Sequence, residues 1–334
     1  MDEPKEVKSA LDIGAVTDVD RTEWSRLVAH DGAATFFHTL DWADLLTSTL
    51  TGFRPAHFEA REAGRLLGGI PALSRPRFMA ETLESMAFGT FGGPVLAEDA
   101  PDGAGSALLA AFAQAASSLR VGHAQLVDRS GRIDGSKLPG FEQIDDTVQV
   151  VRLDADYEEL KGRFKPSARN KIRKAIKAGV TVRRAESEAD FLSYYTVLEE
   201  CSRDWEVRPR PGLEFFSALS RLDPDAVQMW LALQDGHVLG GDLNFAMHGT
   251  VMNWGNVSTD AAKSLAPNNL LHANAIEQGA RDGHHTYDLG SSGGLEGVRA
   301  FKSSFGTVDA PVRRFVMEKG WYRSLKRAAG RRSG

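Results

Sequence analysis

The sequence predicts an α/β protein built from two related halves. Its length of 334 residues suits two domains, because compact domains usually contain roughly 100–200 residues. A hairpin pattern occurs twice, and its two copies start 172 residues apart, at His57 and Met229. Helical and strand patterns occur together around each copy, which indicates a mixed α/β unit in each half.

The repeated pattern covers 57–73 and 229–245 without gaps. Five residue types coincide: Ala60 with Ala232, Gly64 with Gly236, Leu67 with Leu239, Gly68 with Gly240 and Gly69 with Gly241. Alternating apolar residues around a polar Gly turn predict a β-hairpin in each copy. Two hairpins can share such a turn by chance, but a spacing of half the chain favours duplication of one unit.

In the first half, helical spacing predicts helices over 39–50 and 104–119, and the second leads into a strand over 124–127. A strand over 148–153 then gives way to a charged helix. We therefore expect one domain over 1–155 and a second over 156–311.

The second half starts with a basic helix within 164–179. Ser167 suits its N-cap and Gly179 its C-terminal stop, and the predicted apolar face contains Ala168, Ile172, Ala175 and Ile176. Further helices are expected over 190–201 and 269–280, the second between Pro267 and Gly283. We expect the first of them to bury Phe191, Tyr194, Tyr195 and Leu198. Strands over 251–257 and 286–289 complete this half.

Composition indicates a folded chain, with 42% hydrophobic and 25% charged residues. No apolar run approaches the roughly 20 residues of a membrane span, and the N-terminus is acidic, so we expect a cytoplasmic protein. Cys201 is the single cysteine and we expect it to be a small core residue. The nine histidines show no metal-ligand spacing, so no metal site is expected. A tightly bound cofactor is not expected either.

Positive charge is concentrated in two stretches, although the net charge is −5. Ten Lys or Arg and no acid lie between Lys161 and Arg184, and six more lie in the last sixteen residues. Arg169, Lys171 and Arg173 of the basic helix are candidates for binding phosphates. The basic C-terminal tail is a candidate for peripheral membrane contact. The alternative for both stretches is a solvated surface.

Three strings in order, ARNKIRKAIKAGV (168–180), YDLGSSGG (287–294) and FKSSFG (301–306), resemble the Fem-type branch of the GNAT acyltransferase superfamily. The resemblance is strongest over 157–315. It implies two tandem GNAT-like domains, each a mixed, mostly antiparallel sheet flanked by helices. It also implies that a last segment, about 312–334, returns to the first domain. It also implies amide-bond formation with aminoacyl-tRNA or acyl-coenzyme A as co-substrate. The long helical-hairpin arm of some Fem proteins is not evident.

The resemblance gives roles to several residues. Lys302 matches a lysine at the Fem active site, where we expect it to stabilise an oxyanion or a phosphate; otherwise it is a surface lysine. Arg203 matches an arginine that holds the phosphorylated acceptor, or else it pairs with a glutamate of its own helix. Val207 replaces the usual aromatic residue, which argues against a peptidoglycan precursor. Trp205, Arg208 and Arg299 are further substrate-binding candidates.

Polar residues of the second hairpin indicate which domain works. Asp242 and Asn244 follow its shared turn on one face of the strand, whereas the first copy has Ile70 and Ala72. Asn253 and Trp254 lie on opposite faces of the next strand, so one of them faces the substrate. We therefore expect the working site in the second domain.

Three further features bear on the chemistry. Asp288 is a candidate general base or amine-orienting group, or a structural residue that binds loop amides. Asn268 and Asn269 begin a helix whose N–H groups suit a pyrophosphate. The loop before it lacks the coenzyme A fingerprint of the superfamily, which favours aminoacyl-tRNA or a degenerate coenzyme A site. The loop 290–297 is expected to be flexible.

Three functions follow from these features. The first is transfer of an acyl group, or of an aminoacyl group from tRNA, to the amine of a small metabolite, a peptide or a cell-wall precursor. The second is acyl-CoA-dependent N-acetylation of a small metabolite. The third is a catalytically silent module that binds RNA or a membrane.

Overall fold

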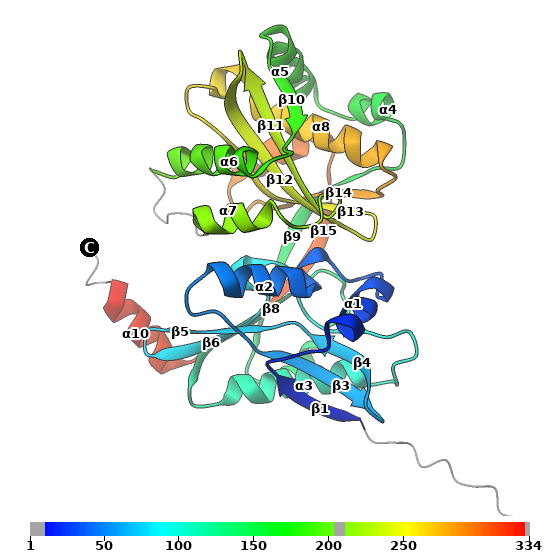
Figure 1. Cartoon of the computed structure of the whole chain (residues 1–334), viewed down its shortest axis with the longest axis vertical. Helices are drawn as coiled ribbons and strands as arrows, with labels where there is room; N and C mark the ends of the chain where they lie inside the picture. Colours follow the sequence, from blue (N-terminus) through cyan, green and yellow to red (C-terminus); the bar gives the residue numbers. More distant parts are fainter. Residues whose placement is uncertain (1–10, 204–210, 331–334) are drawn as a thin grey trace, which may run out of the picture. The chain divides into compact units, whose positions relative to one another are not determined.

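A computed structural model describes residues 11–203 and 211–330. The chain forms two compact units (Figure 1): unit 1 contains 1–145 and 312–334, and unit 2 contains 146–311. The chain enters unit 2 within β9 (Glu142–Arg152) and leaves it within β15 (Val308–Glu318). The division therefore falls ten residues before the expected boundary at 155, because it lies inside a long strand and not at the strand's end.

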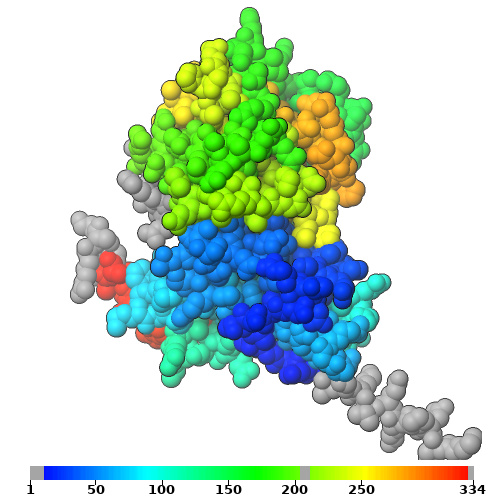
Figure 2. All heavy atoms as spheres, in the orientation of Figure 1, coloured from blue at the N-terminus to red at the C-terminus, as the bar shows by residue number. Residues whose placement is uncertain are grey.

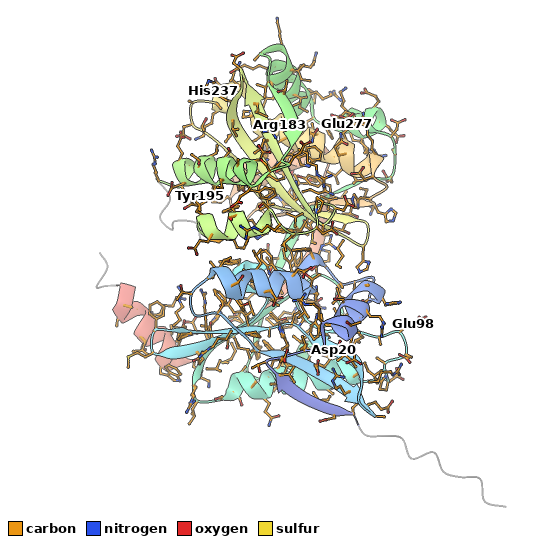
Figure 3. The ribbon with its side chains drawn as sticks, viewed as in Figure 1. Asp20, Glu98, Arg183, Tyr195, His237 and Glu277 are labelled. Atoms are coloured by element: carbon orange, nitrogen blue, oxygen red, sulfur yellow. The ribbon has the colours of Figure 1, made fainter. Side chains whose placement is uncertain are left out.

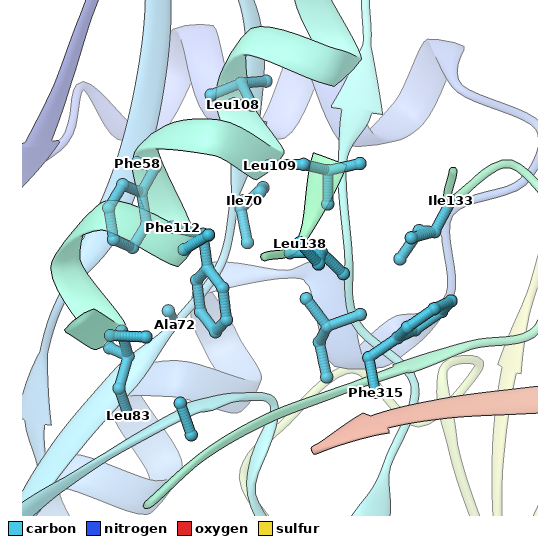
Figure 4. Close-up of a cluster of buried hydrophobic side chains, with 14 of the residues drawn as sticks. Phe58, Ile70, Ala72, Leu83, Leu108, Leu109, Phe112, Ile133, Leu138 and Phe315 are labelled. Carbon is cyan, nitrogen blue, oxygen red and sulfur yellow. The ribbon is translucent and has the colours of Figure 1, made fainter. Parts of the chain in front are cut away.

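Unit 1 has a four-stranded sheet, β1-β3-β4-β7, and a second set of strands in the order β15-β8-β6-β5-β2. Its elements are β1 (Asp12–Val16), α1 (Arg21–His30), α2 (Leu40–Thr49), β2 (Arg54–Pro55), β3 (His57–Glu62), β4 (Arg65–Ile70), β5 (Leu73–Arg77), β6 (Ala80–Ser85), β7 (Val95–Leu96), α3 (Ala104–Ser117), β8 (Val121–Asp128) and α10 (Gly320–Gly330). Phe58 packs on Phe112 in its core, with ring centroids 5.6 Å apart, and Phe315 belongs to the same core, which includes most of the buried face of α3 (Figure 4).

Unit 2 contains the strand order β10-β11-β12-β13-β14-β9. Its elements are α4 (Tyr157–Gly162), α5 (Pro166–Lys177), β10 (Thr181–Arg184), α6 (Glu188–Cys201), α7 (Leu213–Leu219), β11 (Val227–Gln234), β12 (His237–Met247), β13 (Thr250–Ser258), α8 (Pro267–Arg281), β14 (Thr286–Ser291) and α9 (Glu296–Lys302). The pairs are antiparallel except β13 with β14, which are parallel. This mixed, mostly antiparallel sheet flanked by helices confirms the predicted fold class.

The two hairpins have the same register. Ala60 pairs with Gly68 in β3–β4, and Ala232 pairs with Gly240 in β11–β12. Each ladder shifts directly after that alanine. Each turn also has positive φ at the two equivalent residues before the second strand, which is the backbone of a type I′ turn. A shared turn alone does not require a shared bulge, so the structure confirms the internal duplication.

The shared LGG string has a steric reason at its last glycine. A Cβ on Gly69 would lie 2.6 Å from the Trp24 ring of α1, and a Cβ on Gly241 would lie 2.5 Å from the Tyr194 ring of α6. In both units the absent side chain lets a helix that precedes the hairpin press an aromatic ring against the strand. The same contact therefore recurs in both copies.

The helices show where local prediction was wrong. Lys165, and not Ser167, is the N-cap of α5, because Pro166 occupies the first helical position. Ile176 was expected on the apolar face of α5 but is 59% exposed. On α6, Val197 is buried. Tyr195, which Figure 3 labels, is only partly buried. Within residues 11–203 and 211–330, no helix is both long and apolar enough to cross a bilayer.

Candidate active site

Asp242 is the centre of a buried polar cluster in unit 2. Its carboxylate accepts hydrogen bonds from Nδ2 of Asn244 (2.9 Å), Asn253 (2.7 Å) and Asn256 (2.7 Å). The hydroxyl of Tyr287 also donates to it, at 3.3 Å. Asp242 and Asn244 are completely buried. A carboxylate without water loses several kcal/mol of hydration, and hydrogen bonds to a charge return about 1.5–3 kcal/mol each, so the four donors offset that loss.

A bulge in β13 brings the asparagines together. The register shifts between Leu243 and Asn244 of β12, so that Trp254 is an extra residue of β13. Residues three apart in a regular strand face opposite sides of the sheet. The extra residue removes that difference, and Asn253 and Asn256 both reach the carboxylate of Asp242.

Trp254 lies on the other side of the sheet. Its ring stacks on Phe215 of α7, with centroids 5.8 Å apart, and meets Phe245 edge-on. Asn253 and Trp254 therefore face opposite sides as predicted, and it is Asn253 that joins the polar cluster.

His272 of α8 extends the cluster through Tyr287. The imidazole Nδ1 lies 2.7 Å from the Tyr287 hydroxyl, and both side chains are buried. In the arrangement where Tyr287 donates its single hydrogen to Asp242, it accepts from His272, and the imidazole proton then lies on Nδ1. Burial and the charge of Asp242 raise the pKa of Tyr287 well above its ordinary value, so the phenol stays protonated.

The imidazole of His272 is held neutral. Burial lowers the pKa of His272, the carboxylate of Asp242 opposes this shift, and the ammonium of Lys302 adds to it. With Nδ1 protonated, Nε2 is the basic nitrogen. The hydrogen bonds thus run from His272 to Tyr287 and from Tyr287 to Asp242. This order resembles that of a base oriented by a buried carboxylate.

Lys302, the last residue of α9, binds the end of β14. Its ammonium donates to the carbonyls of Gly290 (3.1 Å) and Ser291 (2.8 Å). Burial lowers the pKa of Lys302, and the charge of Asp288 opposes that shift. These two bonds use two of the three N–H groups of the ammonium.

Asp288 lies on β14 beside this lysine. The carboxylate is buried and accepts a hydrogen bond from the amide of Gly290, at 2.7 Å. This is the loop-binding contact that was expected as the alternative to catalysis. The contact also fixes the backbone whose carbonyls bind Lys302.

The strands β13 and β14 separate beside these groups. Their parallel ladder joins three residue pairs and ends at Met252 with Asp288. Beyond that point β13 carries Asn253 and Asn256, whereas β14 leads to the carbonyls that bind Lys302. The polar groups of unit 2 therefore lie on both strands at the place where the sheet ladder stops.

Gln149 of β9 holds the loop after β14. Its amide nitrogen donates to the carbonyl of Arg299 and to the hydroxyls of Ser303 and Thr307, and its oxygen accepts from Ser292. Gln149 is buried. The predicted flexible loop 290–297 is thus bonded at both ends, and its last two residues already belong to α9. The resulting short connection keeps Lys302 close to β14.

The predicted donor-binding groups lie on α5 and at the start of α8, two helices that pack against each other. Lys171 and Arg173 are exposed, and Arg169 donates to the carbonyl of Gly162. The start of α8 has no side-chain cap, which leaves its first N–H groups suited to an anion. Asn269 is buried, and Asn268 Oδ1 is a buried atom without a hydrogen-bond partner among the described residues.

The remaining predicted residues do not join the cluster. Arg203 is exposed just after the end of α6, and Arg299 forms an ion pair with Asp309 at 2.5 Å. Trp205 and Arg208 lie outside the described residues. Cys201 is only partly buried and donates to the carbonyl of Ser258. In the described ranges, no three His, Cys, Asp or Glu are grouped as metal ligands.

Sequence reasoning missed four members of the site: Gln149, Asn256, His272 and Tyr287. Tyr287 directly precedes Asp288 in a strand, and successive strand residues face opposite sides of the sheet. This alternation could have indicated that Tyr287 faces the side of β14 opposite Asp288. Asn256 could not be found by alternation, because the bulge at Trp254 reverses the phase of the strand. His272 and Gln149 give no local signal, since their partners are distant in sequence.

Comparison with known proteins agrees with the fold of the chain. Residues 162–303 match the family model of the acetyltransferase (GNAT) domain. The crystal structure of FemX is similar over 93% of this chain and 98% of its own, with a TM-score of 0.69 and 15% identity. The chain has the tandem GNAT fold of Fem-type proteins. That fold accounts for two related units with one return crossing of the chain.

Two other solved structures share the Fem-type fold. A tandem GNAT protein from the clavulanic acid biosynthesis pathway aligns with 92% of this chain and 98% of its own, with a TM-score of 0.58 and 15% identity. L-PGS from Bacillus licheniformis aligns over 94% and 98%, with a TM-score of 0.59 and 13% identity. No curated protein sequence matches the chain. At these identities the likeness establishes the fold.

Proposed function

We propose that unit 2 is an acyltransferase site that forms an amide bond on an amine acceptor. The observation that carries the proposal is the Asp242 cluster, which one copy of the repeated hairpin has and the other lacks. The residues of unit 1 at the equivalent positions, Ile70 and Ala72, are buried apolar side chains. Because only one of the two hairpin copies carries this cluster, the cluster favours a role that is particular to unit 2.

The reaction needs three contributions from the protein. The amine nitrogen attacks the acyl carbon, a C–N bond forms, and the C–O or C–S bond of the donor breaks. The intermediate carries a negative oxygen that needs hydrogen-bond donors, and the attacking amine must lose a proton. The leaving oxygen or sulfur takes up a proton, so the protein returns to its starting state.

We assign these roles to Lys302, which is bound to the end of β14, and to His272 of α8. Lys302 is the oxyanion donor, because its ammonium has a third N–H and its lysine matches the Fem motif. His272 Nε2 is the proton acceptor, with Tyr287 and Asp242 fixing the opposite nitrogen and stabilising the imidazolium. Asp288 then holds the Gly290 backbone, as its bond to that amide indicates.

The acyl donor of the first proposal is an aminoacyl-tRNA. The exposed cations of α5 and the open start of α8 support it, because both suit phosphates. The test incubates the full chain with bulk aminoacyl-tRNA and a panel of amino acids and short peptides, and detects new amides by mass spectrometry. Product that RNase pretreatment abolishes is the expected result. The matched reaction with uncharged tRNA is the control.

An acyl-CoA donor is the second proposal. The tandem GNAT protein from the clavulanic acid biosynthesis pathway supports this donor. Its solved structure is specified as the form without AcCoA, which connects that protein with AcCoA. Product formation from acetyl-CoA alone, insensitive to RNase, would select this donor. If neither donor is consumed while the chain still binds RNA or membranes, the catalytically silent module replaces both proposals.

A further inference from the structure

Unit 1 exposes large apolar side chains at one end of its strands. β6 and β8 begin at this end, since Glu81 pairs with Val121, and β15 finishes there, since Glu318 pairs with His123. The β5–β6 turn places Met79 there with 97% of its surface exposed, and the α3–β8 turn places Leu119 there with 89% exposed. Such exposure of two large apolar residues in adjoining turns is unusual for a surface that faces only water.

The helix α10 lies at the same end of unit 1. Tyr322 anchors it, because this side chain is buried, stacks on His123 and contacts Phe78 of the β5–β6 turn. Gly122 makes room for that ring, because a Cβ there would lie 2.4 Å from Tyr322. Figures 1 and 2 show α10, in red, at the surface beside the β5–β6 hairpin, in cyan.

The helix α10 is anchored through the face that carries Tyr322, and a second apolar stripe of the helix is exposed. Trp321 and Leu325 are four residues apart, so they lie on one side of the helix. Their side chains are 40% and 37% exposed. We call the set of Met79, Leu119, Trp321 and Leu325 the apolar end surface.

Cations outnumber acids around the apolar end surface, where the acids are Glu81 and Glu318. The cations are Arg77, Arg120, Lys319, Arg323, Lys326 and Arg327, and 319–334 contains no acid. Glu318 pairs with both Arg323 and Lys326, so one carboxylate faces two cations. The chain as a whole carries −5, so this local excess runs against the overall charge.

We propose that the apolar end surface docks on a bilayer containing anionic phospholipid, with α10 in the plane of the headgroups. Trp321 lies at the headgroup level, Leu325, Met79 and Leu119 reach the acyl boundary, and the cations contact anionic headgroups. A nucleic acid would use the cations but leave the four apolar side chains in water. The inference does not depend on the acyltransfer proposal, because it concerns unit 1 and is tested by binding alone.

The experiment is co-sedimentation of the full chain with phosphatidylcholine vesicles, with and without phosphatidylserine, at low and high salt. Binding is expected only with phosphatidylserine and is expected to weaken with salt. The double variant Met79→Ser/Leu119→Ser should bind at least ~10-fold more weakly, because it removes two side chains that insert into the bilayer. Both residues are exposed in turns, so the substitutions should leave the fold intact. Trp321→Ser/Leu325→Ser should act alike.

The matched control is Ile176→Ser/Leu295→Ser, which removes two exposed apolar side chains from unit 2. Its vesicle binding should equal that of the unmodified chain. Failure to sediment with any vesicle overturns the proposal, as does equal loss in the control. If light scattering shows a dimer that Met79→Ser/Leu119→Ser dissociates, a second copy of the chain occupies the surface and the bilayer is excluded. Tight RNA binding that those substitutions leave unchanged, without vesicle binding, also overturns it.

Discussion

Asp242 accepts a hydrogen bond from Asn256, 2.7 Å away, because Trp254 is an extra residue in β13. Without that bulge the asparagine would face the opposite side of the sheet, towards α6 and α7. The packing of the Trp254 ring on Phe215 therefore accompanies the polar cluster on the other face. One local irregularity thus serves an apolar contact and a buried carboxylate at once.

The Asp242 cluster should contribute strongly to stability. Asp242→Asn removes the charge that four donors share and turns an N–H group towards other N–H groups, so a loss of about 3 kcal/mol in the free energy of unfolding is expected. Urea unfolding measures it. Asp260→Asn, which loses an exposed ion pair with Lys263, should change that free energy by less than about 1 kcal/mol. Equal effects of the two substitutions would show that the Asp242 cluster stabilises the fold no more than an exposed ion pair does.

Lys302 should matter for turnover beyond its contribution to folding. Lys302→Met is expected to lower kcat by roughly 10²–10³-fold, the effect of losing one oxyanion donor. Lys319 is a matched control in unit 1, because its ammonium also donates to two consecutive carbonyls, those of Ser117 and Ser118. Steady-state kinetics of Lys319→Met should be unchanged. A Lys302→Met enzyme with full kcat would remove the lysine from the chemistry.

The acid limb of the pH–rate profile should report His272. Because burial lowers its pKa, the imidazole stays neutral and active to a pH below its ordinary 6.5, and activity falls as it becomes protonated. The carboxylate of Asp242 opposes that lowering, so Asp242→Asn should move the acid limb to still lower pH. Measuring kcat against pH for both proteins tests this. An acid limb that stays in place would show that His272 is not the titrating base.

Unit 1 should lose stability in mild acid through His38 and His57. Burial lowers the pKa of each to about 4. Between about pH 6.5 and 4 the unfolded chain binds these protons and the folded chain does not. The free energy of unfolding therefore decreases by about 1.4 kcal/mol for each histidine with every unit by which the pH is lowered. The contribution is complete above pH 6.5. His57→Gln, which keeps an acceptor for the amide of Ala72, should roughly halve the slope in denaturant titrations at several pH values. An unchanged slope would argue against the shift.

The duplicated glycine contacts should be equally sensitive. Gly69→Ala and Gly241→Ala each place a methyl group on an aromatic ring, and overpacking of this kind costs about 1–3 kcal/mol. Gly14→Ala is the control, because nothing lies within 4 Å of its Cβ position. Thermal unfolding should rank both hairpin variants below the control. If Gly14→Ala destabilises as much, loss of backbone freedom and not the ring contact is the cause.

The duplication and the class of fold could be predicted from the amino-acid sequence. The five coincident positions of the two hairpins predicted a turn and a pairing that both units have, because alternation and a Gly turn act between residues close along the chain. Because the two hairpins align without gaps, the sequence alone also showed that Asp242 and Asn244 take the places of Ile70 and Ala72.

Which polar residues meet depends on how the folded chain packs. Gln149 binds Ser303, and His272 reaches Asp242 through Tyr287, across separations that no local pattern encodes. Ile176 is exposed and Asn256 turns inward because a helix face and a strand phase depend on the neighbours that pack against them. Side-chain periodicity fixes the elements, whereas burial and a single bulge select their partners.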